Sequence, residues 1–416
     1  MPSMSRDKTG LTVFVTLSIL YFFSIFHRVG IAPIANTLVV DFNTDNSVLG
    51  LMSGMYFYSY AAAQIPVGIM LDKIGTRKTL TILGIIASFG NLIFSLSPTV
   101  PILALGRGLI GFGVGGFYVS ALKALAVSYN PKRYATLTGT LTSIGHVGGV
   151  AASSPLALLT LSLGWREAFL IIFLLMFLFV VVSWFTINTN EEKLLKGKRS
   201  IRKDFGKILS NSQLLKIMPV PFFVYGSFVS FQGLWAGPFL MNVYGMSKAD
   251  ASLFFMFISI GFMVAFPLAG IISDKANRKK PVLLTGITLS LFFWLVMSIF
   301  GAALASYQLL ALLAFLGISY GITCIFLTIP ATLFPLEIAG SAIASLNIFN
   351  FIGGGFFQYL MGFIIDSTHQ TGNEFFSYQI IFLFCALGVL VSLAGSILFK
   401  EHSSNEKEET DKTANA

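Results

Sequence analysis

Long apolar runs, separated by short polar stretches, follow one another along almost the whole chain. The runs are continuous instead of alternating, which favours helices over strands. Each has about 20 residues or more, the length that a helix needs to cross the roughly 30 Å hydrocarbon core of a bilayer. We therefore predict twelve membrane-spanning helices, at residues 11–38, 48–71, 79–97, 101–127, 135–161, 166–187, 217–242, 249–273, 281–302, 306–333, 338–365 and 376–399.

A polar, basic stretch at residues 188–216 divides these helices into two groups of six. The pattern predicts an N-terminal six-helix bundle at 1–187, this stretch as a linker, and a C-terminal six-helix bundle at 217–400. Residues 401–416 carry almost no apolar side chains, and we expect them to be disordered. The first apolar run continues past Arg28 and is too long for a signal peptide, so we interpret it as a membrane helix.

The composition also indicates that the bilayer is the solvent for most of this chain. Hydrophobic residues make up 55% of the 416 positions and charged residues 11%, whereas a soluble domain is about 25% charged. In lipid every backbone polar group must be satisfied within the protein, which leaves helices or a closed barrel. Cys324 and Cys385 show no metal-ligand or disulfide spacing, and no catalytic cluster is evident. We therefore expect an all-α membrane protein that is not an enzyme and needs no metal or cofactor.

The positive charges are distributed asymmetrically along the chain, whose net charge is +9. If both termini and the linker are cytoplasmic, most of the 27 Lys and Arg residues fall on that side, and only Arg166 and Lys248 lie outside. This asymmetry matches the positive-inside rule and predicts that both termini are cytoplasmic. We expect the basic surface to face anionic lipid, and we expect no nucleic-acid partner.

A short motif occurs twice, about half the chain length apart. Residues 68–78 read GIMLDKIGTRK, and residues 270–280 read GIISDKANRKK. A basic cytoplasmic loop alone does not explain why Gly, Asp and the basic cluster recur at matched places. The repeat predicts two structurally related halves.

Both loops resemble the signature loop of the major facilitator superfamily, Gly-x-Leu-x-Asp-Arg-x-Gly-Arg-Lys, with Lys73 in place of the first Arg. Residues 107–111, Arg-Gly-Leu-Ile-Gly, resemble the family's Arg-x-x-x-Gly motif, and Gly-Trp-Arg at 164–166 resembles another of its junctions. The resemblance covers roughly residues 10–400. It implies the major facilitator fold, two pseudo-symmetric six-helix bundles that rock about a central site by alternating access. We expect a monomer.

The resemblance also assigns a gating role to the two loops. In the family the loop Asp pairs with basic groups across a cytoplasmic helix interface and latches the outward-facing state. Carried over to this chain, Asp72 and Asp274 would be the latch acids, with Arg77 and Lys279 nearby.

A looser resemblance concerns the substrate. Phe26-His27-Arg28 and Gly-Leu-Trp-Ala-Gly-Pro at 233–238 resemble bacterial nutrient carriers, among them amino-acid carriers of bacteria that live inside host cells. This implies a secondary transporter of a bacterial inner membrane that imports an amino acid, another small carboxylate or a short peptide. Drug-exporting relatives carry a Gly-Pro pair in the fifth helix, which residues 145–149 lack. The alternative is an exporter of an organic anion, a siderophore or a drug-like compound.

Two arginines lie inside predicted membrane helices, where a charged side chain is expensive and marks function by default. Arg28 and Arg107 both fall in the outer halves of their helices, the first and the fourth. In the family the first, fourth, seventh and tenth helices line the central cavity. Two arginines facing it would hold a carboxylate in bidentate fashion. The alternative is that they extend to the outer lipid headgroups.

Neutral polar and aromatic residues also interrupt the apolar helices at three- or four-residue steps, so each set shares a helix face. We expect them to form an amphiphilic pocket, although polar side chains also hold helices together. The candidate substrate-binding residues of this kind are Tyr56, Tyr60, Gln64, Gln232, Trp235, Asn347 and Asn350.

The titratable residues do not identify the coupling ion. No Asp or Glu lies in the middle of a predicted helix, so the buried carboxylate that proton-coupled carriers often use is absent. The remaining candidates for proton coupling are His27 and His146, since histidine titrates near neutral pH. Three alternatives stand: protons through histidine, protons carried with the substrate, or facilitated diffusion.

Overall fold

The computed structural model describes residues 3–129, 131–187, 206, 208, 210–276, 278–334, 336–368 and 373–401, and this part of the chain contains helices and no strand. Eleven helical segments of the described chain are long and apolar enough to cross a membrane. One of them, α3 (Asn46–Leu96), runs for 51 residues and leaves helical geometry at Gly75. The φ angle of Gly75 is 79°, which glycine adopts without strain. Because α3 makes two crossings, the twelve predicted membrane helices and the all-α membrane fold are confirmed.

The first six crossings are built by α1 (Ser3–Val29), η1 (Ala32–Ile34), α2 (Ala35–Phe42), α3, α4 (Val100–Val114), α5 (Phe117–Ser128), α6 (Pro131–Ala151), α7 (Ser154–Leu163) and α8 (Trp165–Thr186). The last six are built by α10 (Ser212–Ile217), η2 (Val220–Tyr225), α11 (Gly226–Ser230), η3 (Phe231–Trp235), α12 (Ala236–Tyr244), α13 (Lys248–Ala276), α14 (Lys280–Phe300), α15 (Ser306–Thr323), η4 (Cys324–Thr328), α16 (Pro330–Leu333), α17 (Leu336–Thr368) and α18 (Glu374–Leu398).

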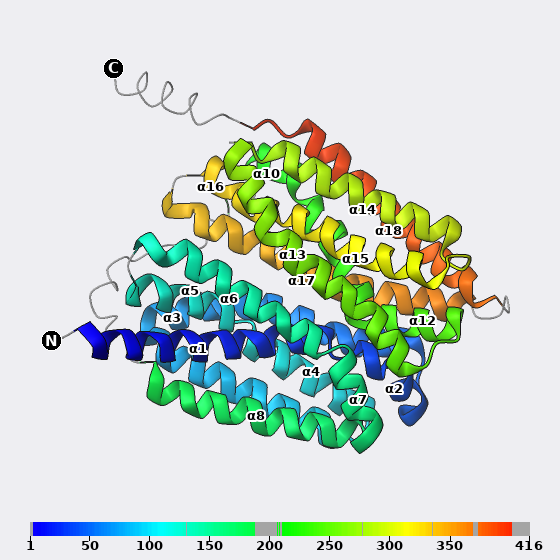
Figure 1. Cartoon of the computed structure of the whole chain (residues 1–416), viewed down its shortest axis with the longest axis horizontal. Coiled ribbons are helices and arrows are strands. Elements are labelled where there is room, and N and C mark those ends of the chain that lie inside the picture. The colour runs from blue at the N-terminus through cyan, green and yellow to red at the C-terminus, as the bar shows by residue number, and fades with distance from the viewer. Residues whose placement is uncertain are drawn as a thin grey trace.

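The helices gather in two halves that lie side by side (Figure 1). In the N-terminal half, residues 3–187, α3 packs on α4 and on α8, and α1 packs on α6. In the C-terminal half, residues 210–401, α13 packs on α15 and α14 on α18. Contacts between the halves come mainly from α17 against α3 and from α13 against α6. Most of the predicted linker at 188–216 and of the predicted tail at 401–416 lies outside the described residues, so both stay predictions.

Several crossings are broken near their middle. The first breaks between α1 and α2 around Pro33, which has no backbone N–H to continue the helical ladder. The fourth breaks at Gly115 and Gly116, between α4 and α5. The seventh and tenth contain π-helical and 3₁₀ turns at η2, η3 and η4. Broken helices of this kind often surround the binding site of a transporter.

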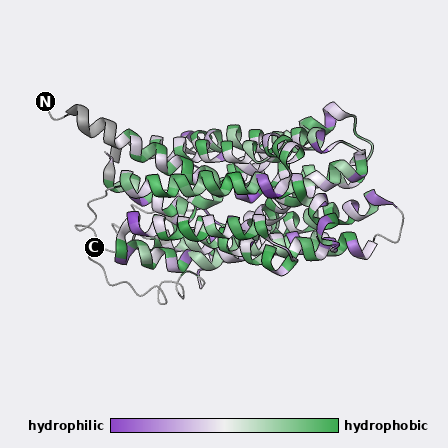
Figure 2. Ribbon diagram, turned by 90° about the horizontal axis from the view of Figure 1, so that it is seen from below, coloured by the Kyte–Doolittle hydropathy of each residue, from purple (hydrophilic) through white to green (hydrophobic). Residues whose placement is uncertain are grey.

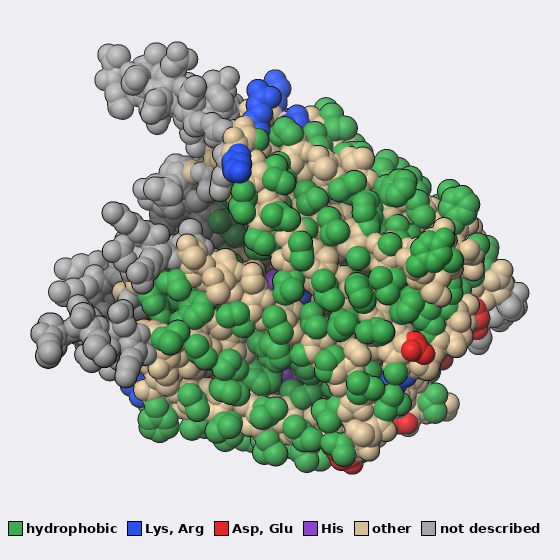
Figure 3. Space-filling model, in the orientation of Figure 1, with side chains coloured by type: hydrophobic (Ala, Val, Ile, Leu, Met, Phe, Trp, Pro, Cys, Tyr) green, Lys and Arg blue, Asp and Glu red, His purple; other side chains and the backbone are tan. Residues whose placement is uncertain are grey.

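The outer surface is apolar, as lipid requires. Phe185 and Leu398 are 76% and 65% exposed, and many other large apolar side chains are exposed along the helices. Hydrophobic positions dominate the long middle part of the helices, and Lys, Arg, Asp and Glu gather near the two ends (Figures 2 and 3). An apolar belt of this size identifies a multi-pass membrane protein.

We name the two ends of the molecule by what lies there. The linker end carries α10, α16 and α5, whose Lys123 pairs with Asp72, and the far end carries α12 and α2, which leads into the start of α3 (Figure 1).

Candidate functional site

A cavity of about 120 Å³ lies between the two halves. Its lining comes from α1, the first half of α3, α5 and α6 on one side, and from η2 to η3, α13, α15 with η4, and α17 on the other. The second half of α3, α8, α14 and α18 contribute nothing to the described lining. The lining residues are Tyr21, Ile25, Arg28, Val29, Tyr60, Gln64, Tyr118, Val119, Thr142, His146, Tyr225, Phe228, Val229, Gln232, Ser259, Phe262, Phe266, Tyr320, Cys324, Leu327, Asn347, Asn350 and Phe351.

Arg28 is the one permanently charged side chain among these lining residues. It lies in the last turn of α1, and its guanidinium carbon is 5.3 Å from the ring centre of Phe351 and 6.0 Å from that of Tyr60. The two rings stack on each other with their centres 3.7 Å apart. Arg28 is therefore held by aromatic faces from α3 and α17, one from each half, through cation–π contacts. Its Nε has no hydrogen-bond partner within the protein, so this N–H group can donate to a bound anion.

Amide side chains supply the neutral polar part of the lining. Nε2 of Gln232 donates to Oγ of Ser259 at 2.9 Å, and Nδ2 of Asn350 donates to Oδ1 of Asn347 at 3.1 Å. The remaining oxygen of Asn350 is buried and has no donor within the protein. These groups can orient the neutral part of a ligand while Arg28 binds its charge.

His146 joins the lining through an aromatic stack that crosses between the halves. Its ring lies 4.2 Å from that of Phe262, which lies 5.4 Å from Tyr320. Nδ1 of His146 is 2.8 Å from the carbonyl oxygen of Thr142, which only accepts, so Nδ1 carries the hydrogen. In the neutral ring Nε2 is then the nitrogen that can accept a proton.

The structure separates the two arginines that we expected to face one cavity. Arg107 does not line the cavity and is completely buried. Its Nη1 donates to the carbonyl oxygen of His27 at 2.9 Å, and its guanidinium lies 4.7 Å from the ring centre of Tyr56. The physical reason is the end of α1 at Val29, because carbonyl groups in the last turn of a helix lack helical donors. Complete burial also excludes the alternative that Arg107 extends to lipid headgroups.

Three other predicted site residues lie outside this cavity. His27 is buried beside Arg107, with its ring against Phe26 and Phe169. The hydroxyl of Tyr56 donates to the carbonyl oxygen of Ser24 at 2.8 Å. Nε1 of Trp235 donates to the carbonyl oxygen of Gln358 at 3.1 Å. The predicted residues that do line the cavity are Arg28, Tyr60, Gln64, His146, Gln232, Asn347 and Asn350.

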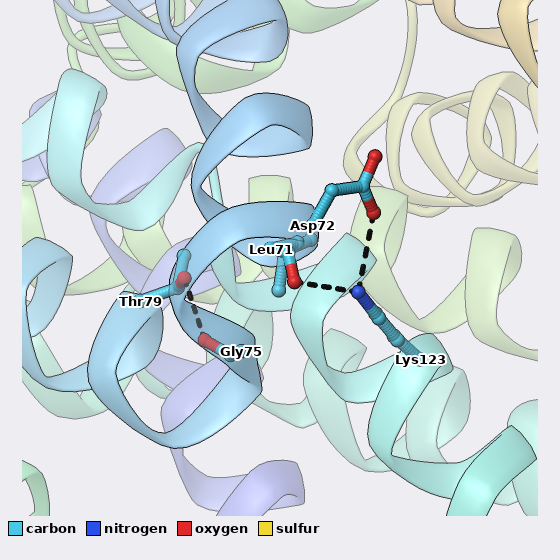
Figure 4. Close-up of polar contacts among 5 residues, drawn as sticks. All are labelled: Leu71, Asp72, Gly75, Thr79 and Lys123. Atoms are coloured by element: carbon cyan, nitrogen blue, oxygen red, sulfur yellow. Dashed lines mark hydrogen bonds and ion pairs between the residues drawn. The ribbon is translucent and has the colours of Figure 1, made fainter. Parts of the chain in front are cut away.

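The loop acid Asp72 pairs within its own half (Figure 4). Its Oδ1 is 3.2 Å from Nζ of Lys123 in α5, which also donates to the carbonyl oxygen of Leu71 at 2.6 Å. Arg77, which we expected near this acid, places its guanidinium 4.1 Å from the ring centre of Trp184. The Asp72 side chain is 82% exposed, so its pairing with Lys123 leaves it accessible to other partners.

The second copy of the loop is only partly described. The side chain of Asp274 lies outside the described residues, so its predicted gating role stays a prediction. Nζ of Lys279 donates to the carbonyl oxygen of Thr328 at 3.0 Å, within the C-terminal half.

Several lining residues were not among the sequence candidates, notably Tyr225, Phe228, Ser259, Phe262 and Phe351. The chain has 42 Phe residues, and a Phe that faces a cavity has the same local pattern as one that faces lipid. The spacing of Phe262 and Phe266, four residues apart, indicates a shared face but does not say what that face contacts.

Comparisons with known proteins find similarity to several bacterial transporters. The chain is 23% identical over 97% of both chains to a probable sulfoacetate transporter of Cupriavidus necator. It is 22% identical over 87% of this chain and 88% of the other to a putative tartrate transporter of Agrobacterium vitis. It is 25% identical over 71% and 76% of the two chains to a probable nitrate transporter of Staphylococcus epidermidis.

Two solved structures share the fold. One is a bacterial homologue of the human lysosomal transporter Spinster, in an inward-facing and unoccupied conformation, with a TM-score of 0.76 and 18% identity over 96% of this chain and 98% of that chain. The other is a D-xylose–proton symporter, with a TM-score of 0.74 and 15% identity over 94% and 99% of the two chains. The sequence model of the Major Facilitator Superfamily matches residues 17–358 and 222–415. The chain belongs to the major facilitator superfamily.

Proposed function

We propose that this protein is a secondary transporter that imports a small organic anion, most simply a carboxylate, which it binds at Arg28. The observation that carries the proposal is a single cationic side chain in an otherwise neutral cavity between the two halves. A guanidinium with an unpaired Nε, in surroundings of low dielectric, attracts an anion more strongly than it would in water.

The same lining favours a plain carboxylate over an amino acid or a peptide. An amino acid would bring an ammonium group that needs a counter-charge, and the described lining residues include no Asp or Glu. Aromatic faces such as those of Phe228 and Tyr320, stacked 4.1 Å apart, are the remaining option for an ammonium group. The relatives named above for sulfoacetate, tartrate and nitrate support an anionic substrate.

Alternating access would use the two predicted bundles, 1–187 and 217–400, as the moving parts. The lining extends from Arg28 in the last turn of α1 to Leu327 in η4, towards the linker end. The charge asymmetry of the sequence makes this the cytoplasmic end, so we assign the structure to an inward-facing state with both termini in the cytoplasm. The inward-facing bacterial relative of Spinster supports this assignment.

We also assign proton coupling to His146 in preference to His27. His146 lines the cavity and connects α6 to the Phe262 ring of α13, so a proton on Nε2 would be sensed by the substrate and by both halves. His27 lines no part of the cavity.

The decisive experiment is uptake into proteoliposomes from a mixed pool of carboxylates, sulfonates, amino acids and short peptides, read by mass spectrometry. We expect Arg28→Gln to lower uptake of the selected anion at least about tenfold, because a buried charge pair contributes several kcal/mol. Arg28→Lys should retain part of the uptake, because lysine keeps the positive charge but lacks the two parallel N–H groups of the guanidinium. Lys400→Gln, which removes an exposed basic side chain outside both loops, is the matched control.

Two outcomes would contradict the proposal. If the Arg28→Gln variant took up the anion at the wild-type rate, Arg28 would not be part of the binding site. If the protein selected an amino acid over every plain carboxylate, the substrate would be zwitterionic, as the sequence resemblance implied. If preloaded proteoliposomes instead release an organic anion against its gradient, the alternative of an exporter is correct.

A further inference from the structure

We propose that Arg107 forms a second anion site, separate from the cavity, that binds one oxyanion or halide in bidentate fashion. This site goes beyond the proposed function, because its existence does not depend on which substrate the protein carries or in which direction.

The first observation is that one edge of this guanidinium is unused. Nη1 of Arg107 donates to the carbonyl oxygen of His27, whereas Nε and Nη2 are completely buried and have no hydrogen-bond partner within the protein. The N–H groups of Nε and Nη2 point in the same direction from one edge of the planar guanidinium. This edge is the fork that binds a carboxylate, another oxyanion or a halide.

The second observation concerns charge. The Arg107 side chain is completely buried, and arginine does not lose its proton in proteins. Among the described residues, no Asp or Glu forms an ion pair with Arg107. The C-terminal end of α1 and the face of Tyr56 offset part of the charge. An unpaired charge within the membrane remains expensive, and a bound anion would offset the rest.

Other buried polar groups lie on the elements that contact Arg107, α1 and α3. Both ring nitrogens of His27 are buried without a partner within the protein. The hydroxyl of Ser53 is also buried and unpartnered, and it lies one helical turn from Tyr56 on α3. A hydroxyl and a neutral imidazole can each donate one hydrogen bond to an anion that the Arg107 fork holds.

The position of the site relative to the cavity follows from α3. The ring of Tyr60 lies beside Arg28 and the ring of Tyr56 beside Arg107, and the two ring centres are 6.1 Å apart. Because Tyr56 and Tyr60 are four residues apart, they lie on one helix face, and Tyr56 is the nearer to the far end. Arg28 and Arg107 therefore contact aromatic rings that lie one helical turn apart on α3.

Bromide and acetate distinguish the possible occupants. Purified protein is titrated with each salt, and the midpoint of thermal unfolding is followed, since an anion that binds only the folded state raises it. We expect bromide to raise the midpoint of thermal unfolding of the wild type and of Arg28→Gln. It should have no such effect on Arg107→Gln. If acetate reproduces and competes with the bromide effect, the site takes a substrate-like carboxylate. If only bromide acts, it is a halide site.

A measurement on the wild type guards against a variant that fails to fold. Crystals grown in bromide should give an anomalous peak within hydrogen-bond distance of Nε and Nη2 of Arg107. A peak at Arg28 alone, or a bromide effect that persists in Arg107→Gln, would overturn the proposal. Neither result depends on uptake, so loss of this site and failure of the proposed transport function are distinguishable.

Discussion

The two ends of the molecule use a carboxylate in opposite ways. At the far end, Oδ1 of Asp366 in α17 accepts from N and Nδ2 of Asn46 at 3.0 and 2.9 Å, and Oδ2 accepts from N of Ser47 at 2.7 Å. This carboxylate belongs to the C-terminal half and caps α3 of the N-terminal half, where it interacts favourably with the helix dipole. At the linker end, Asp72 pairs with Lys123 of its own half. We infer that the far end is held closed by contacts between the halves, while the paired residues at the linker end leave the halves free to separate.

Backbone contact reinforces the closed end. A Cβ atom added at Gly50 would overlap the carbonyl group of Gln358, and one added at Gly362 would overlap the carbonyl group of Asn46. Small residues of this kind let membrane helices approach closely. At the far end α3 and α17 therefore touch through their backbones, whereas at the linker end the Asp72 side chain is 82% exposed.

Among the variants that test this difference between the two ends, Gly50→Leu should have the largest effect. The added side chain forces α3 away from α17, so we expect uptake to fall at least about tenfold, since a tenfold change needs only 1.4 kcal/mol. Cys324 lines the cavity and Cys385 does not, so a Cys385→Ser background provides a native thiol reporter. A membrane-impermeant thiol reagent should label Cys324 mainly from the linker end in the parent and from both ends in Gly50→Leu.

Gly139→Leu is the matched control, because a Cβ at Gly139 meets nothing within 4 Å. Unchanged labelling from the far end in Gly50→Leu would show that the α3–α17 contact does not close that end.

Asp366→Asn tests the cap itself and should have an intermediate effect. The change removes the charge and one acceptor oxygen, and hydrogen bonds to a charged group contribute about 1.5–3 kcal/mol, less where the group is partly exposed. We expect about fivefold faster labelling of Cys324 from the far end, corresponding to about 1 kcal/mol. The control is Asp250→Asn, because Asp250 accepts from Ser247 within its own half. Equal effects of the two variants would assign no special role to Asp366.

Lys123→Met tests the Asp72–Lys123 pair at the linker end and should have the smallest effect. It frees Asp72 to pair across the halves, and an exposed ion pair contributes about 0–1 kcal/mol. We expect labelling of Cys324 from the linker end to slow by less than about threefold. Faster labelling would mean that Lys123 itself helps to close the linker end.

The fold was accessible from the sequence because run length alone decides whether a helix can cross a bilayer. Arg28 lines the cavity, as we expected of a charge inside a membrane helix. The place of Arg107 was not predictable, because it depends on where α1 ends and leaves the His27 carbonyl group without a helical donor.

The α3 residues show the same limit. Tyr60 and Gln64 line the cavity and Tyr56 does not, although all three share one helix face. Tyr56 lies one turn closer to the far end, where Gly50 brings the two halves into contact and the cavity has ended. Helical spacing specifies a face but not how far along that face a cavity extends.

The stack of Tyr60 on Phe351 has a thermodynamic consequence. One ring belongs to each half, and both contact the guanidinium of Arg28. Any rearrangement that parts the rings must therefore change how Arg28 is held and so its affinity for an anion. By reciprocity, an anion that arrives at Arg28 must shift the balance between open and closed forms by the same factor. Binding and gating at this contact are two measures of one coupling free energy.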